Sequence, residues 1–345
     1  MRKQAVLLGN ANTKRTDFFM QAAATAQLPV LFIDWKDIKR WKSALTGAKQ
    51  LMKIDPPLWD SCSLEDLTRL TNDYQRQLQE LAQAAQRYPL EFFNHPSAII
   101  QLLDKRICKT KLVQAGITVT KMLEEEEPGG WTTQKLLHTM QTKHLHQVFI
   151  KPVSGSGAAG VSAFRWQPSV GRMALYTCAM LHPAYGLVNT RRLRRFSSRQ
   201  EVLSYLDRIL ESDCIVERWY AKAQYQGDSY DMRAVLVDGK TEFLLARCSK
   251  GPITNLHLNN HPLKAEETGL PDHVLEEIDS LCKKAVECFS GLRIAGIDIL
   301  LEKGSLRPRI IEMNAQGDLI YQDIYHENKI YRRQAELMYD WQKDG

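Results

Sequence analysis

The segment AGIDILLEKGSLRPRIIEMNAQGDL, residues 295–319, predicts two antiparallel strands joined by a tight turn. Ile, Ile and Leu alternate with other residues over 297–301, which is typical of a strand with one buried face. The Lys-Gly-Ser sequence at 303–305 supplies a turn, and a second apolar strand follows over residues 308–314. The segment therefore indicates a β-hairpin.

Three oxygen-bearing side chains of this hairpin, Asp298, Glu312 and Asn314, are predicted to meet. Glu312 and Asn314 are two residues apart and share one face of their strand, and Asp298 joins them where its face opposes theirs. Two carboxylates and an amide oxygen suit Mg²⁺, a hard cation that also keeps water and phosphate oxygens as ligands. The alternative is a chance cluster of acids on a solvated hairpin.

The composition is that of an ordinary globular chain. Its 345 residues, 44% of them hydrophobic, are enough for two or three packed domains. No stretch approaches the roughly 18 consecutive apolar residues of a spanning helix, and residues 1–15 lack the pattern of a secretory signal, so we expect a cytoplasmic protein. The seven cysteines include no C-x-x-C pair, which argues against a disulfide framework or a zinc site. A net charge of +6 fits anionic ligands such as nucleotides as easily as nucleic acid.

Residues 4–33 follow a strand, helix, strand order, which predicts the start of an open α/β sheet. Ligands of such sheets collect at the carboxyl ends of the strands, here around Gly9-Asn10 and Asp34-Trp35. The N-terminal region is therefore a candidate substrate domain.

Periodic apolar residues predict further elements along the chain. Helices are expected over residues 63–88, 97–115, 134–144, 198–210, 272–289 and 323–341, and strands over 117–122, 147–151, 214–219, 231–237 and 241–248. The apolar positions of the last helix could make a homo-oligomer contact or pack on their own domain.

Residues 148–161, VFIKPVSGSGAAGV, place Lys151 at a strand end before a loop with three glycines. Backbone amides of such a loop can surround phosphates. The loop is not a Walker sequence, because no lysine followed by Ser or Thr comes after the glycines, and it is not a dinucleotide fingerprint. In isolation, a plain hairpin turn is the commoner interpretation.

The order of the motifs is more specific than any one of them. Asp104-Lys105 precedes Lys151 and its glycines, Glu217 follows near the end of an apolar strand, and the acidic hairpin comes last. This succession, over about residues 90–320, resembles the ATP-grasp superfamily. It is nearest to the ligases that add glutamate to ribosomal protein or other peptides, with D-alanine:D-alanine ligases and glutathione synthetases more distant.

The resemblance implies an α/β (α+β) chain with the ATP-grasp fold. Its expected parts are an N-terminal open α/β substrate domain at residues 1–95, a linker helix and central lid with the glycine loop at 96–213, a catalytic subdomain at 214–322 and a C-terminal helix at 323–345.

The resemblance also implies which residues bind ATP, which are catalytic and which bind the metal. Phosphate contacts are implied for two lysines and the glycine loop: Lys105, Lys151, Ser154, Gly155, Ser156, Gly157 and Gly160. Adenine contacts are implied for the strand over residues 214–220, through Glu217 and the backbone near Trp219. Residues near the transferred phosphate are Arg233, Arg247, Asn255 and His257. The implied Mg²⁺ ligands are Asp298, Glu312 and Asn314, with Glu312 able to bridge two ions.

Each basic residue also has a structural interpretation. Arginines on strands are usually surface partners of acidic neighbours, and His257 is as easily satisfied by a backbone group. The Arg191–Arg195 tract is either a solvated basic edge or a grip on an acidic peptide, and nucleic acid is not expected because no aromatic residues are interleaved there.

The sequence departs from the family in three places. No carboxylate stands at residues 221–224 to bind ribose, so Asp228 or Gln224 is the candidate. Residues 314–318 are Asn-Ala-Gln-Gly-Asp, where the glutamate ligases have Asn-Ala-Ser-Pro-Gly. The stretch between the glycine loop and Glu217 is also longer than the family leads us to expect.

These features together predict an ATP- and Mg²⁺-dependent carboxylate-amine ligase that forms an acyl phosphate on an amino-acid or peptide substrate. The alternatives are a kinase on the same scaffold, and a nucleotide-gated binding module without turnover.

Overall fold

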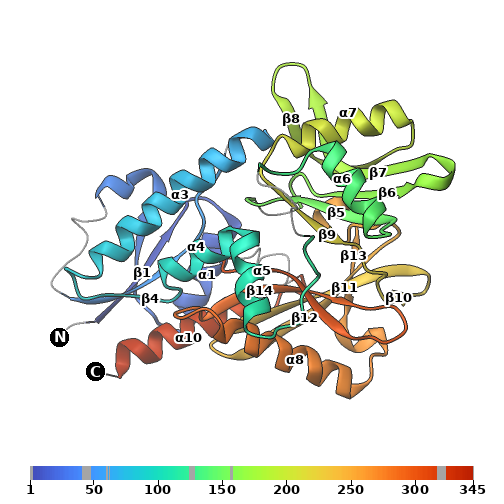
Figure 1. Ribbon diagram of the computed structural model, residues 1–345. Helices are drawn as coiled ribbons and strands as arrows, with labels where there is room; N and C mark the ends of the chain where they lie inside the picture. The colour runs from blue at the N-terminus through green and yellow to red at the C-terminus, as the bar shows by residue number, and fades with distance from the viewer. Residues whose placement is uncertain are drawn as a thin grey trace.

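The computed structural model describes residues 3–40, 48–59, 61, 63–123, 129–155, 158–316 and 324–344. These residues form three sheets with helices around them, and Figure 1 shows the first sheet on the left, the second at the upper right and the third below it.

The first sheet is parallel throughout, in the order β2-β1-β3-β4. Its strands are β1 (Lys3–Gly9), β2 (Val30–Asp34), β3 (Lys49–Ile54) and β4 (Leu90–Phe92), and its helices are α1 (Lys14–Thr25), η1 (Trp35–Arg40) and α3 (Leu64–Ala84). Helix α1 begins at Thr13, whose hydroxyl accepts from the Thr16 amide. The predicted open α/β sheet is therefore present.

The second sheet is antiparallel, in the order β8-β7-β6-β5-β9. Its elements are α6 (Thr133–Thr142), β5 (Gln147–Pro152), β6 (Ser162–Gln167), η2 (Pro168–Val170), β7 (Arg172–His182), β8 (Gly186–Phe196), α7 (Arg199–Leu210) and β9 (Cys214–Arg218). Strand β9 pairs with β5, so the expected boundary at residue 213 would cut through this sheet, and a boundary after β9 fits the pairing better.

The third sheet has the order β13-β12-β11-β14-β15, with β10 paired to β11. Its elements are β10 (Gln224–Tyr225), β11 (Asp228–Val237), β12 (Lys240–Ser249), η3 (Leu256–Leu258), β13 (His261–Lys264), η4 (Ala265–Thr268), α8 (Asp272–Glu287), β14 (Ile294–Leu301) and β15 (Pro308–Asn314). Apolar residues of α8 pack on this sheet and form part of the largest core cluster.

The single helix predicted over residues 97–115 is wrong. The chain forms α4 (Pro96–Leu103) and α5 (Lys105–Gln114), because Asp104 between them has an extended backbone with φ −103° and ψ 109°. The Asp104 side chain accepts from the Ile107 amide and so caps the second helix. Lys105 consequently stands at the first position of a new helix.

The strand predicted over residues 117–122 is also wrong. This segment forms isolated bridges, Val119 with Ile310 of the third sheet and Met122 with Glu217 of the second. The Thr120 amide donates to Ile310 O at 2.9 Å, and the Leu123 amide donates to Val216 O at 2.8 Å. A segment that passes from one sheet to the other cannot continue a ladder with either.

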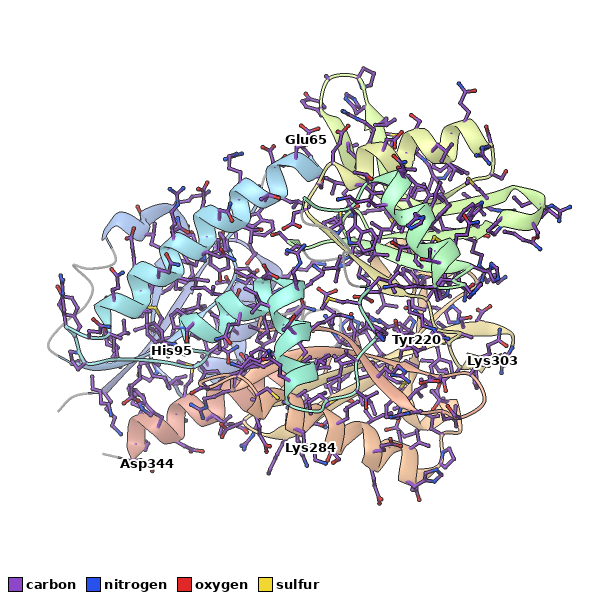
Figure 2. The ribbon with its side chains drawn as sticks, in the orientation of Figure 1. Glu65, His95, Tyr220, Lys284, Lys303 and Asp344 are labelled. Carbon is purple, nitrogen blue, oxygen red and sulfur yellow. The ribbon has the colours of Figure 1, made fainter. Side chains whose placement is uncertain are left out.

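Two helices tie distant parts together. Helix α3 extends from the first sheet to the hairpin of β7 and β8, where Ser63 bridges Val188 and Glu65 lies beside Gly186 (Figure 2). Helix α10 (Lys329–Lys343) buries Ile330, Ala335 and Met338 against the first sheet and α1, so it packs on its own chain. None of the described helices is long and apolar enough to cross a membrane.

Candidate active site

Strands β14 and β15 form the antiparallel hairpin that the sequence predicted, and the register settles on which face Asp298 lies. Asp298 lies directly opposite Glu312, and Gly296 lies opposite Asn314. A bulge after Asp298 accommodates Ile311 as the extra residue. Asp298, Glu312 and Asn314 line one common pocket, so the hairpin brings the three predicted metal ligands together.

Two pockets meet at this hairpin. The first lies between the second and third sheets, and we call it the inter-sheet pocket; its lining includes Phe149, Lys151, Glu217, Tyr220, Leu300 and Ile311. The second, the N-terminal pocket, reaches α1, α3 and α4; its lining includes Arg15, Trp59, Tyr74, Leu102, His257 and Asn314. Both pockets are lined by Ala158, Arg247, Asn255, Asp298 and Glu312, which we call the junction.

Both predicted catalytic arginines are buried and bind Asp298. Arg247 Nη2 lies 3.2 Å from Asp298 Oδ2, and Arg233 Nη1 donates to Asp298 Oδ1. The interpretation of these arginines as exposed surface partners is therefore wrong. Their guanidinium groups hold the carboxylate of a predicted metal ligand at the junction.

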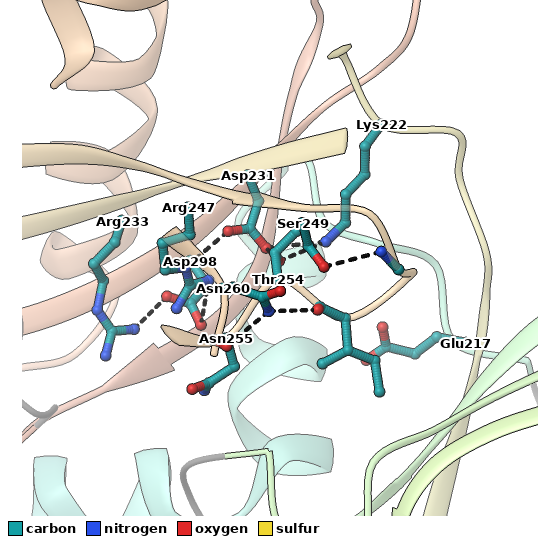
Figure 3. A network of polar contacts seen from close by, with 12 residues as sticks. Glu217, Lys222, Asp231, Arg233, Arg247, Ser249, Thr254, Asn255, Asn260 and Asp298 are labelled. Atoms are coloured by element: carbon teal, nitrogen blue, oxygen red, sulfur yellow. Dashed lines mark hydrogen bonds and ion pairs between the residues drawn. The ribbon is translucent and has the colours of Figure 1, made fainter. Parts of the chain in front are cut away.

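Asp231 is a functional candidate that the sequence did not single out. Its carboxylate accepts from Arg247 Nε at 2.8 Å, from Lys222 Nζ at 3.1 Å and from the Thr254 hydroxyl (Figure 3). Burial alone would raise the pKa of this carboxyl, but the charges of Arg247 and Lys222 outweigh it and lower the pKa to about 2. Asp231 stays ionised and fixes the Arg247 side chain.

The same network shapes the loop that carries Asn255 and His257. Asn260 Nδ2 donates to the carbonyls of Ile253 and Asn255, each at 2.8 Å (Figure 3). Asn255 Oδ1 accepts from the His257 amide at 2.9 Å and so begins the short helix η3. Together with the Thr254 contact to Asp231, these bonds present Asn255 at the junction and His257 in the N-terminal pocket.

Glu217 has a setting that its predicted position facing adenine did not suggest. Its carboxylate is 1% exposed and lies 2.6 Å from Lys109 Nζ, 2.9 Å from Lys151 Nζ and 2.9 Å from the Thr120 hydroxyl. Burial raises the pKa of this carboxyl, but the two lysine charges outweigh it and the pKa is lowered. Glu217 therefore holds Lys151, and Lys109 is a second residue that the sequence did not single out.

Lys105 joins the glycine loop to the metal ligands. Its Nζ donates to Gly155 O at 2.6 Å and lies 3.6 Å from Glu312 Oε1. Gly160 has φ +67°, and a Cβ there would lie 2.8 Å from Pro152 Cγ, so this position requires glycine. Ser156 and Gly157 lie outside the described residues. Strands β5 and β6 pair on either side, so the loop closes a hairpin.

Some predicted residues lie away from the pockets. Neither lining includes Lys105, Ser154, Gly160 or Trp219, although Lys105 lies 3.6 Å from Glu312, which lines both pockets. The Trp219 carbonyl instead accepts from Gln147 Nε2 at 3.2 Å. Gln224 and Asp228, the two candidates for ribose, are absent from the described lining as well. The group that meets the sugar must be sought elsewhere.

No protein-family model and no curated protein matches this sequence. Solved structures match over almost the whole chain. The macrocyclase MdnC of Microcystis aeruginosa MRC, bound with precursor peptide MdnA, has a TM-score of 0.60 at 12% identity, over 98% of this chain and 100% of that chain. The ATP-grasp ligase PsnB, complexed with minimal precursor, Mg and ADP, has a TM-score of 0.59 at 14% identity, over 98% of each chain. This chain has the ATP-grasp fold.

A third structure, of the D-cycloserine synthetase DcsG, has a TM-score of 0.59 at 11% identity, over 97% of this chain and 99% of that chain. The ATP-grasp fold expected from the order of the motifs is thereby confirmed.

The buried charges of this site favour an anionic ligand. Six basic side chains and four carboxylates form its ion pairs: Lys105, Lys109, Lys151, Lys222, Arg233 and Arg247 with Glu217, Asp231, Asp298 and Glu312. An excess of buried positive charge is costly unless an anion neutralises it. Arg233 Nε is also buried without a hydrogen-bond partner among the described residues. Nucleotide phosphates fit these observations.

The hairpin also fits a divalent cation. Its donors are all oxygens, which Mg²⁺ prefers. The two contacts from Arg233 and Arg247 leave Asp298 with about two of its roughly four lone-pair sites. Glu312 has Lys105 as its ion-pair partner at 3.6 Å, a separation that leaves its oxygens accessible to a metal. Asp298, Glu312 and Asn314 would hold the ion.

Gly296 provides a test of the predicted phosphate and metal site. A Cβ on Gly296 would lie 3.3 Å from Arg233 Cζ, so Gly296→Ala should displace the guanidinium from Asp298. We expect ATP turnover to fall about tenfold or more, because small misplacements of charge-stabilising groups are costly. Gly304→Ala, in the turn of the same hairpin at φ +91°, should lower thermal stability and leave turnover near normal. Equal turnover in the two variants would contradict this role of Gly296.

Lys109 makes a prediction about pH. Burial lowers the pKa of its ammonium from 10.5 to about 8, although Glu217 opposes the shift. Between these values the unfolded chain binds more protons, so the contribution of Lys109 to the free energy of unfolding increases with pH. The free energies of unfolding of wild type and Lys109→Met are measured in urea. Their difference should be constant below pH 8, and wild type should become more stable relative to the variant as the pH rises from 8 to 10.5. A difference that is flat throughout would contradict the prediction.

Proposed function

We propose that this chain is an ATP- and Mg²⁺-dependent carboxylate-amine ligase that releases ADP. The observation that carries the proposal is the junction, where Arg247, Asp298 and Glu312 line both pockets. A nucleotide in the inter-sheet pocket would place its terminal phosphate at the junction. A second substrate in the N-terminal pocket would meet that phosphate from the opposite side.

The chain's own residues position and neutralise the phosphates. Lys105 and Lys151 reach the nucleotide from α5 and β5, and Arg233 and Arg247 reach it from the third sheet. Such transfers depend mainly on positioning and charge stabilisation. Mg²⁺, when bound, would add Lewis-acid stabilisation of the phosphoryl oxygens.

The reaction has two steps. A carboxylate oxygen of the second substrate attacks the γ-phosphorus, and the bond from that phosphorus to the β,γ-bridging oxygen breaks. ADP departs as the leaving group, and the substrate becomes an acyl phosphate. An amine then attacks the acyl carbon, phosphate departs with the bonding electron pair, and the ammonium proton passes to solvent. The product is an amide.

The substrate we propose is an amino acid or a peptide. Two proteins of the same fold, PsnB and MdnC, are complexed with precursor peptides. Strand β8, an edge strand of the second sheet, carries Arg191, Arg192, Arg194 and Arg195, which suit acidic groups of a peptide. We also propose the four domains expected from the sequence, with the second boundary moved to the end of β9. We propose in addition that the protein acts in the cytoplasm, where ATP is supplied.

Trapping with hydroxylamine tests the proposal. Purified protein, ATP and Mg²⁺ are incubated with amino acids or peptides, with and without hydroxylamine, and nucleotides and hydroxamates are quantified. A hydroxamate formed together with ADP supports the ligase. ADP with a phosphorylated hydroxyl and no hydroxamate would indicate a kinase, and AMP as the product would refute the proposal. Tight ATP binding without turnover on any acceptor would favour a nucleotide-gated binding module.

A further inference from the structure

Lys222 is a buried basic residue of the inter-sheet pocket with no role in the reaction above. Its side chain is 8% exposed, and it follows β9 in a short segment that bridges Glu302 at the end of β14. Burying an ammonium group is costly, and here it lowers the pKa of Lys222, although Asp231 opposes the shift. A lysine in this setting needs a structural or functional reason.

The contacts of Lys222 leave one donor over. Nζ donates to Asp231 Oδ2 at 3.1 Å and to Thr254 Oγ1 at 2.7 Å, as Figure 3 shows. An ammonium group carries three N–H bonds, and these two acceptors are its partners within the described part of the chain. Because Lys222 lines the inter-sheet pocket, the third N–H is available to a ligand there.

The neighbours of Lys222 indicate which part of a nucleotide it would meet. Tyr220, two residues earlier, and Leu300 line the inter-sheet pocket but not the N-terminal pocket, and they supply aromatic and apolar surface that suits a base. The two partners of Lys222 adjoin the junction on the other side, since Asp231 binds Arg247 and Thr254 precedes Asn255. Lys222 therefore stands between the place for the base and the place for the transferred phosphate.

We propose that Lys222 donates a hydrogen bond to a nucleotide oxygen between the base and the transferred phosphate, either a sugar hydroxyl or the α-phosphate. The inference rests on the proposed function. A donor with no acceptor capacity then occupies the part of the pocket where the family resemblance implies a carboxylate. Asp231 and Thr254 would be positioning residues, which orient the ammonium group toward the ligand.

Nucleotide binding by wild type and Lys222→Met tests the proposal. Dissociation constants are measured by calorimetry for ATP, 2′-deoxy-ATP, 3′-deoxy-ATP, AMP and adenosine. We expect the variant to bind ATP about tenfold to a hundredfold more weakly, the usual effect of losing a hydrogen bond from a charged donor. If Lys222 contacts a sugar hydroxyl, Lys222→Met should weaken the binding of ATP more than the binding of the analogue that lacks that hydroxyl. If Lys222 contacts the α-phosphate, the substitution should weaken the binding of AMP and leave the binding of adenosine unchanged.

The same data can overturn the proposal. Equal weakening of all five ligands, or none, would show that Lys222 acts only on the structure. A wild-type protein that binds none of them would instead refute the proposed function, and this inference with it. If Lys222→Met fails to fold, Lys222→Gln provides the comparison, because glutamine is also uncharged but keeps an amide donor for Asp231.

Lys53 offers a matched control. It is also buried and pairs with a carboxylate, Asp55, but it lies in the first sheet and lines neither the inter-sheet nor the N-terminal pocket. Lys53→Met should cost stability and leave the order of the five affinities unchanged. A change in that order equal to the one in Lys222→Met would show that any buried lysine has this effect, and would contradict the proposal.

Discussion

Glu312→Gln is expected to reduce ATP turnover by about a hundredfold or more, in the range found when a group that stabilises transition-state charge is removed. Glutamine keeps the shape of the side chain but removes its negative charge and one acceptor oxygen. Glu312 is the carboxylate that faces Asp298 across the hairpin and lies 3.6 Å from Lys105, at the junction of both pockets. Loss of this charge should therefore weaken metal binding and leave Lys105 less well positioned to contact the phosphates.

ADP release measured over a range of Mg²⁺ concentrations checks this result. The variant should need more Mg²⁺ for half-maximal turnover and should remain slower at saturation. Glu302→Gln is the matched control, because Glu302 follows β14 of the same hairpin, pairs with Arg309 and lines neither pocket. Wild-type turnover and Mg²⁺ dependence in Glu312→Gln would remove Glu312 from the site.

Arg247→Lys, which conserves charge, is also expected to lose about a hundredfold or more in turnover, since groups that orient and stabilise a transferred phosphate have effects of this size. Arg247 uses two nitrogens to bind two carboxylates, with Nε 2.8 Å from Asp231 and Nη2 3.2 Å from Asp298. A single ammonium nitrogen cannot reproduce this fork. One of the two carboxylates should lose its partner, and the free energy of unfolding should fall by about 1–3 kcal/mol, the cost of an unsatisfied buried acceptor.

Turnover and urea unfolding of Arg247→Lys are compared with those of Arg309→Lys. Arg309 also makes an ion pair through Nε, with Glu302, but it lies outside both pockets and its side chain is more exposed. Its replacement should change turnover little, because Arg309 lines neither pocket. The free energy of unfolding should fall by about 1 kcal/mol or less, the usual contribution of a partly exposed ion pair. Similar losses in the two variants would indicate a general effect of shortening arginines.

Local patterns predicted the hairpin well. Strand periodicity and a Lys-Gly-Ser turn are short-range signals, and they predicted the two strands and the shared face of Glu312 and Asn314. Whether Asp298 faces them was left open by the sequence, and the register places it opposite Glu312. The break at Asp104 had a local signal too, since aspartate is a favoured helix cap, but the apolar pattern on either side concealed it. The hairpin of β7 and β8 was not predicted, because a register shift between Thr177 and Ala179 interrupts its alternation.

The buried ion pairs could not be predicted from short-range patterns. Lys109 has the appearance of a surface residue on a helix, and its partner Glu217 comes from a strand 108 residues later in the sequence. Lys222 and Asp231 are closer in sequence, yet only the packing of the second sheet over the third shows that both side chains are largely buried. Charged residues are rarely buried unless paired, so the partner has to be known first.

The packing of α10 on the first sheet has a consequence for how the protein is made. Leu7 and Phe19 share a core cluster with Ile330 and Met338, so β1 and α1 are completed by a helix that is synthesised about 310 residues later. At about 5–20 residues per second, roughly 15–60 s of translation separate the two. During that interval the apolar residues of β1 and α1 that contact α10 lack this partner, and exposed apolar surface makes a folding chain prone to aggregate.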